Sequence, residues 1–157
     1  MKKFKLTSEF IVDISGVKLF RIKALIEFGN VKAGDLGGYI EKEENLSHMG
    51  DAWVSGDARI SGDAQVFGDA WVFGDARVFG YARVSGDKDY AYAHGFGSCN
   101  RTTTFFRLKD GDVGVRCGCF YGTLAQFRDK VCETHGETKK AQEYLMLADL
   151  MEIRFKN

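Results

Sequence analysis

The sequence has no long hydrophobic run, no proline and no net charge. None of its apolar stretches approaches the ~20 residues that a membrane span needs, so no transmembrane helix is expected. Its 22 basic residues equal its 22 acidic residues, and no long-range field therefore favours a nucleic-acid polymer or a membrane as partner. The sequence from Met1 lacks a hydrophobic signal core, so its four cysteines indicate reduced thiols in a cytoplasm. With no proline and 19 glycines, the composition is typical of a chain with many corners.

A six-residue unit occurs six times in succession from Gly50, just before a further glycine at Gly86. The units read GDAWVS, GDARIS, GDAQVF, GDAWVF, GDARVF and GYARVS. Neither a helix nor an ordinary strand has a period of six. The spacing predicts one short strand and one tight corner in each unit. The aliphatic residue and the alanine point inward, and the Gly-Asp pair takes the corner.

These units resemble those of the hexapeptide-repeat, left-handed β-helix proteins, in which three units make one triangular coil of 18 residues. The resemblance implies that residues 18 apart lie on top of one another. The expected pairs are Trp53 with Trp71, Arg59 with Arg77, and Gln65 with Arg83. The expected fold class is mainly β with an α+β tail: a left-handed parallel β-helix of hexapeptide repeats plus a C-terminal ββαα module.

Changes in this pattern divide the chain into three regions. They are an N-terminal β cap at 1–33, the repeat region at 34–94 and the ββαα module at 95–157. In the last region, strands are expected at 101–108 and 113–120, joined by an Asp-Gly turn. Thr123 and Thr138 are suitable N-caps for the two helices that follow.

The expected hairpin of the third region predicts a ligand-binding face. If Asp110 and Gly111 form a two-residue turn, Phe105 faces Arg116, and arginines, aromatic rings and a threonine share one face. Arginine forks suit phosphates, aromatic rings suit planar bases, and hydroxyls suit sugars. The preceding loop could add backbone N–H donors for an anion. An ordinary solvated face, or one packed on the repeats, is the alternative. The candidate ligand-binding residues are Ser98, Asn100, Arg101, Thr103, Phe105, Arg107, Arg116 and Phe120.

Several segments are similar to segments of phage and prophage accessory proteins. They read LFRIKAL, VKAGDLGGYIE before the GDA repeats, GSxxRTTTFF and CGCFxGT. Some small phage proteins of this kind are sponges that sequester nucleotide-derived immune signals, such as cyclic ADP-ribose isomers. The resemblance implies a non-catalytic protein without a cofactor that binds a small nucleotide-like ligand in the cytoplasm, the host's if phage-encoded. The matching positions are Gly97, Ser98, Arg101 to Phe106 and Cys117 to Thr123.

Outward aromatic residues of the repeats predict self-association, with a homotrimer or higher homo-oligomer expected. Two or three coils make a short core, and stacked aromatic faces could be buried between copies. Alternatively, the N- and C-terminal segments of the same chain cover these rings. The candidate interface residues are Trp53, Trp71, Phe73 and Phe79.

Three other interpretations compete with the ligand-binding one. A hexapeptide-repeat acyltransferase using coenzyme A would need a general base, but the repeats hold no histidine and only His48 and His94 flank them. A protein-binding inhibitor or structural adaptor would use the tryptophan ladder as its contact surface. A zinc site could use two cysteine-containing pairs, although buried free cysteines more often act as small hydrophobes, so no metal is expected. The possible zinc ligands are Cys117, Cys119, Cys132 and His135.

Overall fold

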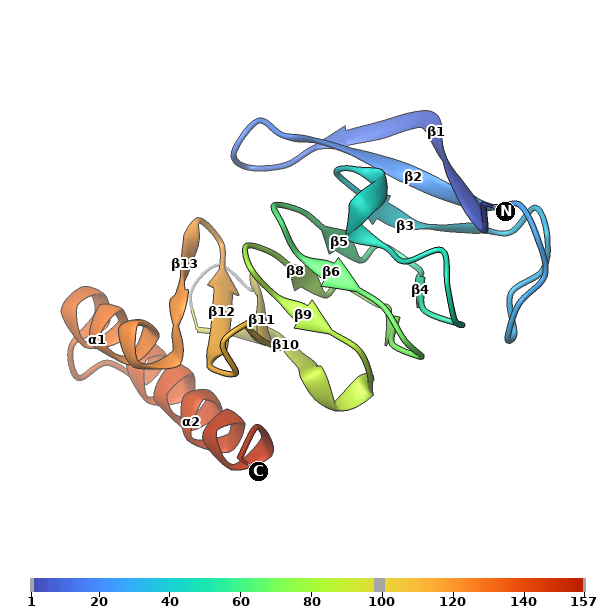
Figure 1. Ribbon diagram of the computed structural model, residues 1–157. Coiled ribbons are helices and arrows are strands. Elements are labelled where there is room, and N and C mark those ends of the chain that lie inside the picture. Colours follow the sequence, from blue (N-terminus) through green and yellow to red (C-terminus); the bar gives the residue numbers. More distant parts are fainter. Residues whose placement is uncertain (1, 98–100, 157) are drawn as a thin grey trace.

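The computed structural model describes residues 2–97 and 101–156, with Arg101 described by its backbone alone (Figure 1). The chain begins with two long antiparallel strands, β1 (Phe4–Val12) and β2 (Lys18–Ala24), followed by β3 (Leu36–Ile40). Asp13 to Val17 form the turn between β1 and β2, where the Asp13 N–H donates to the Val17 carbonyl at 2.9 Å. The β1–β2 pairing shifts register between Leu6 and Phe10. The predicted N-terminal hairpin is therefore present.

The repeat units form six strands of two residues each. Each contains the inward aliphatic residue and the residue before it, and strands 18 residues apart pair in parallel at the expected positions. They are β4 (Trp53–Val54), β5 (Arg59–Ile60), β6 (Gln65–Val66), β7 (Trp71–Val72), β8 (Arg77–Val78) and β9 (Arg83–Val84). Short 3₁₀ helices flank them: η1 (Glu43–Asn45) and η2 (Asp87–Asp89).

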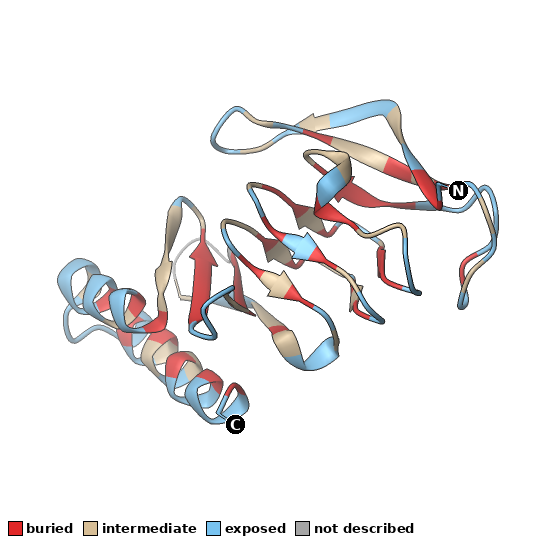
Figure 2. Cartoon of the chain, in the orientation of Figure 1, coloured by how far each residue is buried: buried red, intermediate tan, exposed pale blue. Residues whose placement is uncertain are grey.

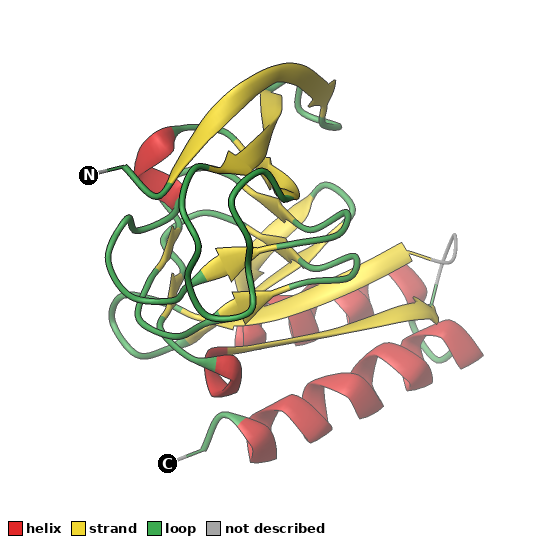
Figure 3. Ribbon diagram, turned by 90° about the vertical axis from the view of Figure 1, so that its right-hand side faces the viewer, coloured by secondary structure: helices red, strands yellow, loops and turns green. Residues whose placement is uncertain are grey.

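The four-stranded antiparallel sheet and two helices follow (Figure 3). The sheet has the order β10-β11-β12-β13, with β10 (Tyr90–Phe96), β11 (Arg101–Arg107), β12 (Val113–Cys117) and β13 (Phe120–Thr123). The helices are α1 (Leu124–His135) and α2 (Lys139–Arg154). Thr123 and Thr138 cap them as predicted, since their hydroxyls accept hydrogen bonds from the N–H groups of Gln126 and Ala141. Within the described residues, no helix is long and apolar enough to cross a membrane.

The predicted fold class, a left-handed parallel β-helix with a ββαα module, is wrong. The fold is mainly β with several small sheets and two C-terminal helices. The β4–β7 and β6–β9 pairs are isolated two-stranded sheets, whereas β5 and β8 belong to a mixed five-stranded sheet of order β1-β2-β3-β5-β8. Each repeat strand has too few residues and too few parallel neighbours to build a continuous solenoid. The C-terminal region also has four strands rather than two, because β10 pairs with β11 and β13 with β12.

Two hydrophobic cores lie on opposite sides of β11 (Figure 2). The first is inside the repeats, where the aliphatic residue and the alanine of each unit are buried, including Ile60 and Ala76. The second lies between the four-stranded sheet and the helices. Successive strand residues point to opposite faces, so Phe106 enters the first core and Phe105 the second. The C-terminal sheet thereby covers the last repeats on one face and carries the helices on the other.

Candidate anion-binding site

The hairpin of β11 and β12 has a different register from the one predicted. Phe105 pairs with Val115, and Thr104 pairs with Arg116. Leu108 instead faces Asp112 across a three-residue loop, in which Gly111 has a φ of +91°. Such loops with a glycine in the left-handed region are a common hairpin type. A one-residue shift moves each side chain to the opposite face relative to its partner, so the predicted single arginine–aromatic face does not form.

Three predicted ligand residues lie on the helix side of the sheet. Phe105 and Thr103 are fully buried, and the Thr103 hydroxyl lies 3.3 Å from the Cys117 sulfur. Phe120 is half-buried, with its ring 5.7 Å from that of Phe127. These side chains support the second core.

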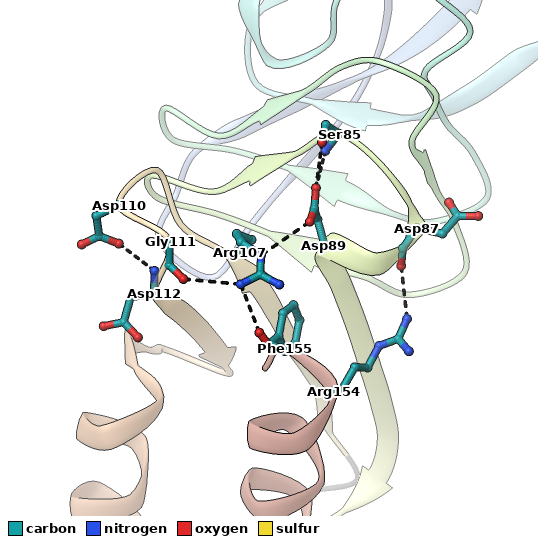
Figure 4. Close-up of polar contacts among 9 residues, drawn as sticks. All are labelled: Ser85, Asp87, Asp89, Arg107, Asp110, Gly111, Asp112, Arg154 and Phe155. Carbon is teal, nitrogen blue, oxygen red and sulfur yellow. Dashed lines mark hydrogen bonds and ion pairs between the residues drawn. The ribbon is translucent and has the colours of Figure 1, made fainter. Parts of the chain in front are cut away.

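Arg107 joins three elements at the edge of the sheet (Figure 4). Its Nε lies 3.5 Å from a carboxylate oxygen of Asp89, and its Nη1 donates to the Phe155 carbonyl at 3.2 Å. Arg154 donates to the Asp87 carbonyl nearby. Both arginines tie η2 to the end of α2, so Arg107 is engaged in the fold. Ser98 and Asn100 lie outside the described residues, as does the side chain of Arg101.

The predicted interface aromatics divide into covered and exposed rings. Trp53 is buried, with the Phe28 ring 5.3 Å away, and Phe79 lies 4.9 Å from the Tyr121 ring. N- and C-terminal segments of the same chain thus cover these two. Trp71 is half-buried and packs against the first core, whereas Phe73 remains 48% exposed.

The possible zinc ligands are not assembled. In the part of the chain that is described, no three His, Cys, Asp or Glu side chains are grouped so that they could hold a metal ion. Cys117 is buried against Tyr144, while Cys119 and Cys132 are exposed. The two histidines that flank the repeats also lie apart in contacts: His48 stacks on Phe4, and His94 is hydrogen-bonded to Thr102.

One cavity brings together charged residues from three distant parts of the chain. Its volume is about 330 Å³, and it lies between the β1–β2 turn, the outer side of β5 and β8, and the strands β10 to β12. We call it the arginine pocket. It is lined by Asp13, Ile14, Leu19, Arg59, Ser61, Arg77, His94, Thr102, Arg116 and Gly118.

The arginine pocket has three guanidinium groups and one carboxylate. Arg59 and Arg77 are paired on neighbouring strands, because they occupy the same place in repeats 18 residues apart. Arg116 is 92% buried from solvent by its 8% exposure, and its guanidinium lies 4.2 Å above the Phe79 ring. The nearest acidic group is the Asp13 carboxylate, with an oxygen 3.8 Å from Nη2 of Arg116.

The arginines are partly deprived of solvent and of partners. Burial lowers the pKa of Arg77, and the charges of Arg59 and Arg116 lower it further. Burial also lowers the pKa of Arg116, although the Asp13 charge opposes this. Nε of Arg59 is buried and has no hydrogen-bond partner among the described residues. A bound anion would both satisfy this donor and reduce the mutual repulsion.

Sequence reasoning found only Arg116 among these arginines. Arg59 and Arg77 were predicted to be stacked but were not assigned to a site. The signal was the same residue type at the same place in two repeats 18 apart, although nothing in the repeat shows which face the N- and C-terminal segments cover. In comparisons with known proteins, no family model and no curated protein matches this chain.

Proposed function

We propose that this protein binds and sequesters a small nucleotide-derived ligand, with a phosphate of that ligand held in the arginine pocket. The observation that carries the proposal is the convergence of Arg59, Arg77 and Arg116 on one cavity that has a single carboxylate. Planar guanidinium groups present paired N–H donors that match phosphate oxygens. Because one Arg59 donor has no partner among the described residues, the pocket has unused binding capacity for such an oxygen.

The size and composition of the pocket support a small molecule. A volume of about 330 Å³ lies at the lower end of the range for ligand sites, which suits one nucleotide unit or one part of a larger ligand. Ser61, His94 and Thr102 add neutral polar groups beside the arginines. This role agrees with the resemblance to phage accessory proteins that sequester immune signals. The proposed setting is the cytoplasm, the host's if the protein is phage-encoded, and the proposed assembly is a homotrimer or higher homo-oligomer.

Titration calorimetry against cyclic nucleotides and ADP-ribose derivatives tests the proposal. Arg77→Gln removes one charge from the pocket and should weaken binding about 30-fold, the effect of losing charge-assisted hydrogen bonds to phosphate. Arg83→Gln is the matched control, because Arg83 has the same place in its repeat but lies outside the arginine pocket. Binding of none of these ligands, or equal affinity of Arg77→Gln and the parent protein, would contradict the proposal.

A further inference from the structure

Asp13 is held rigidly at the end of the N-terminal hairpin. One carboxylate oxygen, Oδ1, accepts hydrogen bonds from the N–H groups of Ser15 at 2.8 Å and Val17 at 3.0 Å. The backbone closes the same turn, since the Gly16 N–H donates to the Asp13 carbonyl at 3.0 Å. The side chain is only 5% exposed. Its second oxygen, Oδ2, is therefore placed by the turn and not by the arginines.

This second oxygen gives the arginine pocket an acceptor. Oδ2 lies 3.8 Å from Nη2 of Arg116, which is an ionic contact too long for a hydrogen bond. Asp13 is the sole carboxylate among the described residues that line the pocket. Of the neutral polar groups there, His94 and Thr102 are bonded to each other at 2.9 Å. The pocket thus combines cationic donors with one strong acceptor.

We propose that Asp13 determines which phosphate-bearing molecules the arginine pocket accepts, by selecting a hydroxyl group next to the phosphate. The inference rests on the proposed function. A ligand that is anionic throughout satisfies the arginines but brings its charge close to a fixed carboxylate. A sugar phosphate satisfies both, because its phosphate binds the arginines and a neighbouring hydroxyl donates to Oδ2. The class of ligand is therefore a nucleotide or sugar phosphate with free hydroxyls, and inorganic phosphate is disfavoured.

Asp13→Asn tests this selection, because an asparagine oxygen can keep both turn hydrogen bonds while the charge is lost. Calorimetry with inorganic pyrophosphate and with ADP-ribose should show opposite effects. Pyrophosphate should bind the variant about tenfold more tightly, and ADP-ribose about tenfold more weakly. Asp57→Asn is the charge-matched control: Asp57 is exposed, acts on Arg77 at a distance, and does not line the pocket. It should change neither affinity by more than about threefold.

A second measurement needs no variant. The parent protein should bind AMP about tenfold more tightly than 2′,3′-dideoxy-AMP, which has the same phosphate without the hydroxyls.

The outcomes separate the two proposals. If Asp13→Asn tightens both ligands, or if AMP and its dideoxy form bind equally, Asp13 is only a competing counter-ion and the selection is wrong, while the proposed function stands. If the parent protein binds ADP-ribose, AMP and pyrophosphate not at all, the proposed function fails and the selection fails with it.

Discussion

Two cavities of equal size lie over neighbouring sides of the same repeats, yet their chemistry differs. The arginine pocket is over β5 and β8, and a second cavity of about 330 Å³ is over β6 and β9. Each is lined by arginine from the same place in the six-residue unit. The second cavity is lined by Lys42, Glu44, Asp63, Ala64, Gln65, Tyr81, Arg83 and Lys109.

The difference lies in what each arginine meets. In the second cavity the cations have carboxylate neighbours, and Lys42 is paired with Asp63 at 2.7 Å with both side chains well exposed. Exposed pairs of this kind contribute little and are easily screened by salt. In the arginine pocket three guanidiniums share one carboxylate, and the covering strands bury Arg116. Equivalent repeat positions therefore acquire different functions through the segments that cover them.

The largest effect is expected from the core that both cavities share. Ile60 is fully buried between Ile40 and Val78 in the five-stranded sheet. Ile60→Ala should lower the free energy of unfolding by about 3 kcal/mol, because it removes buried methyl groups and leaves a cavity. Chemical denaturation measures this, and Ile153→Ala, at a site 72% exposed, is the control. A loss below about 1 kcal/mol would show that the repeats do not depend on this core.

A smaller effect should distinguish the aromatic supports of the two cavities. Arg116 lies 4.2 Å above Phe79, and Arg83 lies 5.1 Å above Phe67. Phe79→Ala should weaken ADP-ribose binding about fivefold, since a buried cation–π contact contributes on the order of 1 kcal/mol to holding the guanidinium. Phe67→Ala, the equivalent change in another repeat, should leave binding unaltered. Equal losses in both variants would erase the distinction between the cavities.

The smallest expected effect concerns pH, and it should arise outside both cavities. Arginines and carboxylates do not titrate between about pH 8 and 10. Lys3 is buried and donates to the Ala52 carbonyl at 2.6 Å, and burial lowers its pKa to about 8. The unfolded chain therefore binds more protons than the folded one above this value, so stability should rise with pH from about 8 toward 10.5.

Lys3→Met should remove that rise, which we expect to be about 1 kcal/mol. Denaturant unfolding at several pH values up to about 10 measures it. The range stops there because burial raises the pKa of Tyr90 to about 12, and a raised tyrosine pKa lowers stability at higher pH. An identical pH dependence in the parent protein and the variant would show that Lys3 is not its source.

Local features of the fold were predictable from particular residues. The inward aliphatic residue of each repeat, the pairing of Arg59 with Arg77, and the capping of both helices by Thr123 and Thr138 follow from spacing and side-chain chemistry. Such features depend on a few neighbouring residues. The fold class was not predictable in this way, because antiparallel β2 joins β3 and the repeat strands in one mixed sheet.

The candidate site was predictable only in its residue types. The loop after Leu108 has one residue more than the predicted turn, and this moved Arg116 away from Phe105 and toward the repeats. The approach of Asp13 depends on the packing of the N-terminal hairpin, which no repeat or spacing encodes. A site assembled from three distant segments is therefore visible only after they pack together.

The consecutive residues Phe105 and Phe106 have a thermodynamic consequence. Their rings lie in different cores, so β11 is a partition with both faces dry along this part of its length. Neither core can be hydrated at this strand without disturbing the other. We therefore expect the repeats and the helical end to unfold in one cooperative transition. A ligand held by Arg116, on the adjoining strand, would stabilise both together.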